Sequence, residues 1–299
     1  MSDPSLTKLA TQAANLDGNA RPCLVFPLDL RSRVRAPLEG PERIMAAENV
    51  IRLLGRYSEG YRLAATHGPS SGIVAEYAYR NTPRGQGPLG RFLDRRFLHN
   101  GVWDGVRLRF QVTQQLVREE RNRRRAEGRK TTILDVASGT ACYLRELLRL
   151  DPGTDLEVFC RERDPKQVMH ARELAAGEGI EISFFVGDAT DEASYLCARD
   201  PDIIIASGLL PLLRRDDVVR SFFRLVVRHL AVDGCFILTT ITDPAARLSP
   251  WETALRLRPA ARSADRVASW LRATGFDEVE CRRYAPDAVA LVARKRRDL

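Results

Sequence analysis

The sequence predicts an α/β fold: a seven-stranded, mostly parallel sheet whose last strand is antiparallel, preceded by an N-terminal helical cap. Two observations support this prediction. From residue 131 onward, five short apolar runs alternate with segments of helical periodicity. Such alternation requires crossovers that make the strands parallel and cover both faces of the sheet. Two further apolar runs then follow each other closely near the C-terminus, as the strands of a hairpin do.

The elements of the second half follow from local patterns. Residues 131–136 (TTILDV) are β-branched and apolar, which indicates a buried strand, and residues 140–150 have apolar positions at helical spacing. By the same criteria, further strands are expected at 157–161, 180–186, 202–207, 235–241, 278–284 and 288–294, and further helices at 165–176, 191–199, 215–230 and 263–274. Only Ala-Pro-Asp separates the last two runs, so the final strand runs antiparallel to the others.

The first part of the chain has a different pattern. Prolines punctuate it, helical periodicity covers residues 42–66 and 91–127 with a break near residue 100, and residues 81–90 (NTPRGQGPLG) are typical of a loop. We therefore expect residues 1–115 to form a helical cap or lid, and residues 116–299 to form the sheet domain.

Charge and composition narrow the class of function. The chain has 299 residues and a formal net charge of +8, of which residues 121–130 contribute +5 and residues 294–299 contribute +3. A nucleic-acid groove needs basic residues spread over one face, with aromatic side chains among them. The two clusters are therefore interpreted as solvated ends of elements, and no nucleic-acid partner is expected. No apolar run reaches 18 residues, so no membrane span is predicted.

The cysteines and histidines indicate neither disulfides nor a metal site. None of the six cysteines forms a CxxC pair, and the four histidines lack ligand spacing. The first twenty residues have neither a basic start nor a long apolar core, so no secretory signal is expected. Buried free thiols in a reducing cytoplasm are the resulting interpretation. The oligomeric state is left open.

Polar residues follow four successive predicted strands, at the edge of an open α/β sheet where ligands bind. After the first strand, the chain turns tightly into a helix whose N-terminal amides can hold an anion. A carboxylate after the second strand, that of Glu162 or Asp164, is suited to accept two ribose hydroxyls, and Asp188 after the third to accept an adenine amino proton. Each acid alone is also compatible with a helix cap. Together they indicate a nucleoside site.

The segment 135–144 (DVASGTACYL) resembles the first motif, D-x-G-x-G-x-G, of class I S-adenosylmethionine-dependent methyltransferases. Asp135 matches the acidic residue and Gly139 the central glycine, whereas Ala137 and Ala141 stand where glycines are usual. The resemblance covers about residues 72–299 and implies a Rossmann-like sheet with S-adenosylmethionine as the cofactor. It implies cofactor-binding roles for residues at the strand ends: Asp135, Ala137, Ser138, Gly139, Glu162, Arg163, Asp188, Ala189 and Ser207.

A narrower resemblance covers residues 77–109, which are similar to the segment before the first motif in a bacterial methyltransferase group often fused to an α/β-hydrolase domain. In that group an aromatic and an acidic residue commonly follow Ser-Gly-Leu, but here they are Leu210 and Pro211. The expected catalytic set is Tyr77, Tyr79, Asn81 and Ser207. Aromatic faces hold a sulfonium by cation–π contact, and the other aromatic candidates are Trp103, Tyr143 and Trp251.

Three functions are compatible with these residues. The first is methyl transfer to a small molecule. The second follows from a resemblance to azetidine-2-carboxylate synthases, enzymes of bacterial secondary metabolism in which the amine of S-adenosylmethionine attacks its own γ-carbon and releases methylthioadenosine. The third is a degenerate cofactor-binding subunit, which the intact acids Asp135, Glu162 and Asp188 disfavour. A dinucleotide enzyme is disfavoured because Gly139 is the only glycine between residues 136 and 150.

Overall fold

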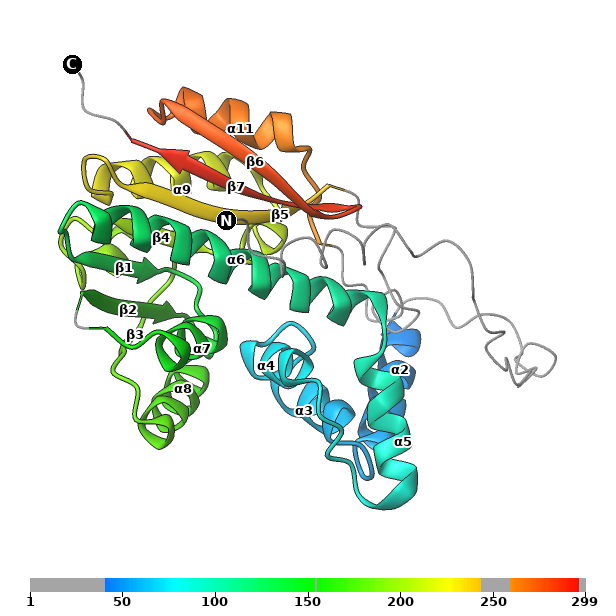
Figure 1. Cartoon of the computed structure of the whole chain (residues 1–299). Coiled ribbons are helices and arrows are strands. Elements are labelled where there is room, and N and C mark those ends of the chain that lie inside the picture. The colour runs from blue at the N-terminus through cyan, green and yellow to red at the C-terminus, as the bar shows by residue number, and fades with distance from the viewer. Residues whose placement is uncertain (1–40, 154, 243–258, 296–299) are drawn as a thin grey trace, which may run out of the picture. The chain divides into compact units, whose positions relative to one another are not determined.

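A twisted seven-stranded sheet organises the chain (Figure 1). The computed structural model describes residues 41–153, 155–242 and 259–295, within a compact unit that spans Gly40–Leu299. The strands are β1 (Thr131–Asp135), β2 (Leu156–Glu162), β3 (Ser183–Val186), β4 (Ile203–Ala206), β5 (Cys235–Ile241), β6 (Glu278–Ala285) and β7 (Ala288–Arg294). Their order in the sheet is β3-β2-β1-β4-β5-β7-β6.

The pairing confirms the predicted topology. Strands β1 to β5 are parallel to one another, with Asp135 of β1 in register with Cys160 of β2 and Ile205 of β4. Strand β7 is antiparallel to both β5 and β6, as the closely spaced runs near the C-terminus predict. The carboxyl ends of β1 to β4 therefore lie along one edge of the sheet, with β1 between β2 and β4.

Helices cover both faces of the sheet, so its central strands are buried on both sides and read as continuous apolar runs. The helices around the sheet are α6 (Gly101–Ala126), α7 (Cys142–Leu150), α8 (Pro165–Glu178), α9 (Asp216–His229) and α11 (Ala264–Ala273). Ile133 packs in one core cluster with α6, α7 and α8, while the adjacent Leu134 packs in a second cluster with α9 and α11. Successive side chains of a strand point to opposite faces, which explains the division.

Four shorter helices precede α6: α2 (Pro41–Leu54), α3 (Glu59–His67), α4 (Gly72–Arg80) and α5 (Gly87–Leu98). The helix expected over 42–66 is interrupted between α2 and α3, where the Ser58 side chain accepts a hydrogen bond from the Tyr61 amide and caps a new helix. Helix α4 has no counterpart in the prediction. It is only nine residues long, and its ends depend on the Ser71 cap and on a left-handed Asn81.

Two short 3-10 helices complete the description, η2 (Glu192–Tyr195) and η3 (Leu210–Leu212). The first replaces the helix expected over 191–199 and starts where Asp191 accepts a hydrogen bond from the Ala193 amide. Helix α6 runs without interruption past residue 115, the expected boundary between cap and sheet domain. It contacts α4 of the cap and β1, β5, β6 and β7 of the sheet, so one element belongs to both layers.

The basic cluster at 121–130 is not simply a solvated helix end, and this corrects the sequence interpretation. Arg121 and Arg124 are fully buried. Arg121 forms ion pairs with Asp151 and Asp155 at 2.9 and 2.7 Å, and Arg124 forms one with Asp202 at 2.6 Å. Buried charges are tolerated only when they are paired, as these are. The ion pairs of Arg121 and Arg124 therefore hold α6 to the residues that directly precede β2 and β4.

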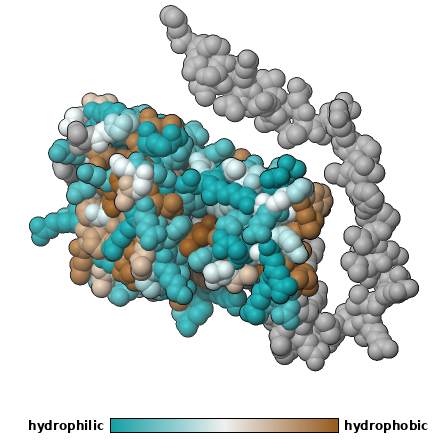
Figure 2. All heavy atoms as spheres, turned by 90° about the horizontal axis from the view of Figure 1, so that it is seen from below, coloured by the Kyte–Doolittle hydropathy of each residue, from teal (hydrophilic) through white to brown (hydrophobic). Residues whose placement is uncertain are grey.

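In the part of the chain that the structure describes, no helix is both long enough and apolar enough to cross a bilayer. On the face seen from below, hydrophobic and hydrophilic side chains are interspersed (Figure 2). The described cysteines are all free: Cys142, Cys160 and Cys235 are buried, Cys197 is half-buried and Cys281 is exposed.

Candidate functional site

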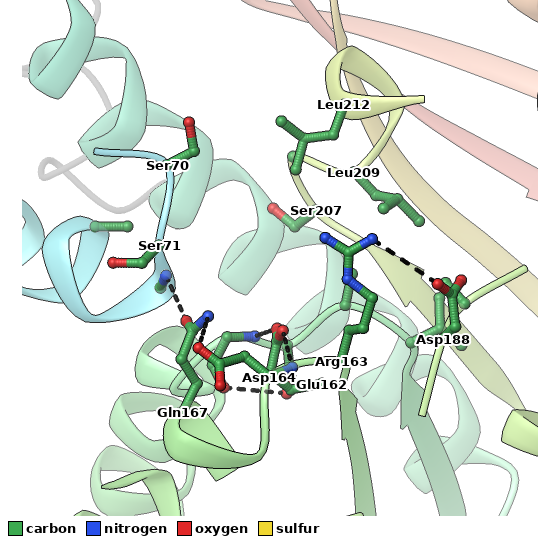
Figure 3. Close-up of a pocket in the computed structure, with 18 of the residues that line it drawn as sticks. Ser70, Ser71, Glu162, Arg163, Asp164, Gln167, Asp188, Ser207, Leu209 and Leu212 are labelled. Atoms are coloured by element: carbon green, nitrogen blue, oxygen red, sulfur yellow. Dashed lines mark hydrogen bonds and ion pairs between the residues drawn. The ribbon is translucent and has the colours of Figure 1, made fainter. Parts of the chain in front are cut away.

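A cavity of about 760 Å³ lies at the carboxyl ends of β1, β2, β3 and β4. Its walls come from the loops that follow these strands, from the cap segment 67–75, and from α6 (Figure 3). The residues that line it include Ser71, Gly72, Arg109, Phe110, Ala137, Ser138, Gly139, Tyr143, Glu162, Arg163, Gln167, Asp188, Ala189, Ser207, Gly208, Leu209, Leu212 and Leu213. The fold thus brings four segments predicted from separate strand ends to one place.

The loop after β1 is held to the neighbouring strand by its backbone. The Ser138 amide donates to the Arg161 carbonyl at 3.0 Å, and the Gly139 amide donates to Glu162 Oε2 at 3.0 Å. Gly139 has a φ of 56°, a left-handed conformation that glycine adopts without cost. Ala141 also has a positive φ, of 54°, although its side chain normally disfavours that region. The loop thus adopts left-handed backbone both where the motif keeps its glycine and where alanine replaces one.

Glu162 ends β2 with its carboxylate in the cavity wall. Besides the Gly139 contact, its Oε1 accepts a hydrogen bond from the Asp164 amide at 3.1 Å. Each carboxylate oxygen has a second acceptor position for a ligand hydroxyl. Asp164, not Glu162, caps the next helix, since its Oδ1 accepts from the Lys166 amide at 2.9 Å. This separates the two acids that the sequence left as alternatives.

Asp188 follows β3 at another side of the cavity, with the neighbouring Ala189 also in the wall. Its Oδ1 accepts hydrogen bonds from the Thr190 amide at 2.8 Å and hydroxyl at 2.7 Å. Burial alone would raise the pKa of Asp188, but these bonds and Arg163 hold it below its usual value. Arg163 extends across the cavity toward Asp188, with 4.0 Å between the charged atoms (Figure 3). The aspartate therefore presents a charged, oriented acceptor.

The wall after β4 is mainly apolar. Ser207 Oγ lies 3.2 Å from Thr113 Oγ1 of α6, and the Gly208 amide donates to Thr239 Oγ1 at 2.8 Å. Beyond them Leu209 and Leu212 face the cavity, on the side opposite Glu162 (Figure 3). Ser207 is the one residue of the expected catalytic set that lines the cavity.

Asp135 does not line the cavity but is fully buried beneath it. Its carboxylate accepts hydrogen bonds from the Tyr143 hydroxyl and, at 3.2 Å, from the Ala137 amide. Burial raises the pKa of Asp135 to about 7, against the lowering effect of these two bonds. Asp135 therefore shapes the loop and orients Tyr143, whose side chain does line the cavity.

The structure places Tyr77, Tyr79 and Asn81 outside the cavity wall, which differs from their expected catalytic role. The Tyr77 hydroxyl is buried and donates to Asp94 Oδ2 at 2.5 Å. Asn81 has a φ of 49° and ends α4, where Arg107 lies 3.4 Å from its side-chain oxygen. These contacts tie the cap helices to one another, a constraint that the local sequence does not reveal.

The aromatic residues at the cavity are Phe110 and Tyr143, whose ring centroids lie 5.5 Å apart. Tyr79 packs behind Phe110 at 4.9 Å, and Trp103 packs on Phe97 at 5.5 Å. Trp251, another candidate, lies outside the described residues. Phe110 was not among the candidates, because only the contact between α6 and α7 brings it to the site.

The cap segment 67–72 and Gln167 are further wall residues that the sequence analysis missed. The Gly72 amide donates to Gln167 Oε1 at 2.6 Å, which joins the start of α4 to α8. A Cβ on Gly72 would lie 2.6 Å from Gly139 Cα, so the cap backbone touches the loop after β1. The Gly68-Pro69 pair in the sequence marks a turn, but nothing local assigns that turn to a ligand site.

The donor set contains few metal-binding groups. Among the residues that the structure describes, no cluster of three or more His, Cys, Asp or Glu side chains is arranged to hold a metal ion. The described polar groups of the cavity wall include carboxylates, hydroxyls, backbone amides, the Gln167 amide and the guanidiniums of Arg109 and Arg163.

The family follows from a match over most of the chain. Residues 28–277 match the model of a family described as "Putative methyltransferase". The chain belongs to this family. Its seven-stranded sheet with the antiparallel strand β7 is a methyltransferase-like α/β fold, which confirms the family resemblance seen in the first motif.

Individual proteins that this chain resembles share low sequence identity with it. It is 26% identical over 261 residues to the uncharacterized protein YnbC of Escherichia coli, and the match covers 81% of this chain but only 43% of that protein. A possible exported protein of Bordetella parapertussis has a similar fold, with a TM-score of 0.62, 17% identity, and coverage of 86% of this chain and 95% of the other. The structure of the CurJ carbon methyltransferase gives a TM-score of 0.57 at 13% identity, and the match covers 84% of this chain and 67% of the other.

Proposed function

We propose that this protein transfers the methyl group of S-adenosylmethionine to a small-molecule acceptor. The observation that carries the proposal is the convergence of Glu162, Asp188 and the Gly139 loop on one cavity. These groups come from three neighbouring strands and offer two carboxylates and exposed backbone beside each other, which is the arrangement that an adenosine needs. Membership of a methyltransferase family supports the same cofactor.

The residues present fit that cofactor. The cavity, about 760 Å³, lies within the usual range for small-ligand sites. Glu162 retains acceptor positions for the ribose hydroxyls, and Asp188 for the adenine amino group. When bound, S-adenosylmethionine supplies a methyl group on a positively charged sulfur. Phe110 and Tyr143 offer aromatic faces to that charge.

The chain itself contributes by positioning the acceptor and by excluding water from the cavity. The cap segment 67–72 and α6 cover the strand ends, so an acceptor in the cavity is held against the cofactor site. Proximity and alignment of this kind are worth up to about 7–11 kcal/mol in favourable cases. The described wall after β4 carries Ser207 and apolar side chains such as Leu209 and Leu212, with no titratable group. We infer that the acceptor is a small molecule whose methylation needs no strong base from this wall.

The apolar wall after β4 also favours a second candidate, cyclisation of S-adenosylmethionine itself. In that reaction the substrate amine attacks its own γ-carbon, the γ-carbon–sulfur bond breaks, and azetidine-2-carboxylate and methylthioadenosine form. No acceptor has to be recognised, which agrees with Leu210 and Pro211 standing in place of an aromatic and an acidic residue. The same experiment separates the two reactions.

The experiment is incubation of the purified chain with S-adenosylmethionine alone, with products followed by mass spectrometry and binding by calorimetry. Binding without breakdown supports methyl transfer, and an acceptor screen then seeks S-adenosylhomocysteine formation. Methylthioadenosine above the spontaneous rate, together with the mass of azetidine-2-carboxylate, supports cyclisation instead. Absence of binding contradicts both proposals. Glu162→Ala is the control, because its loss of the ribose acceptor is expected to weaken either signal at a given S-adenosylmethionine concentration.

A further inference from the structure

The two ends of the cavity differ in charge. Glu162 and Asp188, at the ends of β2 and β3, form an acidic end suited to the adenosine. At the other end, beside β4, Arg109 of α6 contributes a guanidinium to the wall. Strand β1 lies between β2 and β4, so the two ends are about 10 Å apart at the usual spacing of strands. The proposed function does not use Arg109.

Arg109 is held against β4 by close packing. A Cβ on Gly208 would lie 2.9 Å from Arg109 Cζ, so the guanidinium lies directly on the Gly208 backbone. Gly208 has a φ of 82°, a second reason why glycine suits this position. One turn further along α6, Thr113 donates to the Arg109 carbonyl at 2.8 Å and lies 3.2 Å from Ser207. These contacts fix the turn of α6 that carries Arg109 to the end of β4.

The chemistry of the neighbouring groups points to an anion at this end. A guanidinium offers five N–H donors in a planar fork that matches a carboxylate in two parallel hydrogen bonds. The methionine part of S-adenosylmethionine has a positive sulfur, an ammonium and one carboxylate. Only the carboxylate is attracted by Arg109. The end of β1 and the loop that carries Gly139 lie between Glu162 and Arg109, so a ligand with its ribose at Glu162 would have to cross them to reach the guanidinium.

We propose that Arg109 binds the carboxylate of the methionine part of the cofactor and thereby sets how far the sulfonium reaches along the cavity. This inference rests on the proposed function, since it takes S-adenosylmethionine as the ligand. It adds a residue from α6, outside the strand-end motifs, to the binding machinery. The Arg109 guanidinium lies over the Phe110 ring, 5.4 Å from the ring centroid, so this aromatic side chain supports the arginine in its position.

The test compares two nucleosides that differ by the amino-acid tail. Calorimetry measures the affinities of S-adenosylhomocysteine and methylthioadenosine for the wild type, Arg109→Met and Arg109→Lys. A charge-assisted contact of this kind predicts a loss of about 10- to 100-fold for S-adenosylhomocysteine in Arg109→Met, and a smaller loss in Arg109→Lys. Methylthioadenosine, which lacks the carboxylate, is expected to bind all three proteins equally and so reports that each variant is folded.

A matched control and two contrary outcomes complete the design. Arg118→Met removes an exposed arginine from the same helix and is expected to leave both affinities unchanged. Wild-type affinity of Arg109→Met for S-adenosylhomocysteine overturns the inference and leaves the proposed function intact. Equal loss for both nucleosides in the Arg109 variants also overturns it, because the effect then does not depend on the carboxylate. If the wild type binds neither nucleoside, the proposed function itself fails.

Discussion

Replacing Arg145 by methionine tests whether one buried ion-pair cluster fastens the cap to the loop after β1. Arg145, on α7, is 1% exposed, and it donates to Glu76 of α4 at 2.6 Å and to the Thr140 carbonyl at 3.1 Å. It also forms an ion pair with Glu178 at 2.6 Å. A single side chain thus links α4 of the cap, the loop after β1 and α8.

The expected loss of folding stability depends on the buried charges that the substitution leaves without Arg145. Removing one partner of a buried pair typically costs about 3–5 kcal/mol, because the other charge stays buried. Glu76 keeps an ion pair with Arg80 at 2.8 Å, so we expect a loss near the lower limit, about 3 kcal/mol. The assay is urea unfolding followed by circular dichroism. Arg149→Met is the matched control, since Arg149 is exposed on the same helix and pairs only with Glu146.

The pH dependence gives an independent check. Burial by itself would raise the pKa of Glu76, and Arg145 holds it below its usual value. A lowered carboxyl pKa stabilises the folded state above the unfolded pKa, and this stability is lost as the pH falls through the folded pKa. The stability gap between wild type and Arg145→Met should therefore narrow in acid. Equal stability of the Arg145 and Arg149 variants at neutral pH would refute the role assigned to this cluster.

Three further predictions address the site. Glu162→Ala and Asp188→Ala are each expected to lower S-adenosylmethionine affinity by about 10- to 100-fold in calorimetry, and wild-type affinity in both would contradict the site assignment. Gly72→Ala should destabilise the protein by about 1–3 kcal/mol because its Cβ would lie 2.6 Å from Gly139 Cα in the loop after β1, whereas Gly177→Ala, in open space on α8, should not. The wild type should lose stability as the pH rises from the usual aspartate pKa to the raised pKa of about 7, because the folded state holds the Asp135 proton more tightly than the unfolded state. Asp135→Asn should lack this pH-dependent loss. Urea unfolding at pH 5 and pH 8 measures this, and an unchanged pH dependence would contradict the raised pKa.

Local pattern predicted the elements of the sheet domain with small errors. Runs such as 131–136 and 235–241 are apolar because both faces of a central strand are buried, and that property is visible in any window of a few residues. The acids Glu162 and Asp188 were found for a related reason. They directly follow such runs, and the carboxyl ends of parallel strands meet at one edge.

The cap was less predictable because its roles depend on contacts between distant segments. Tyr77 has the residue type of a catalytic group, yet Asp94, seventeen residues further on, binds its hydroxyl within the cap. Phe110 and Arg109 look like ordinary residues of a long helix until α6 is packed against α7 and β4. No spacing within the sequence reports that packing.

The sequence by itself determined the alternation of strands and helices, the antiparallel last strand and the acids at the strand ends, because each depends on the order of neighbouring residues. Tertiary structure alone decided which cap residues reach the cavity, that Asp135 lies beneath it, and that Arg121 and Arg124 are buried. The physical reason is that burial and charge pairing are properties of surfaces brought together over long separations in the chain. Such surfaces become neighbours only when the cap, α6 and the sheet pack.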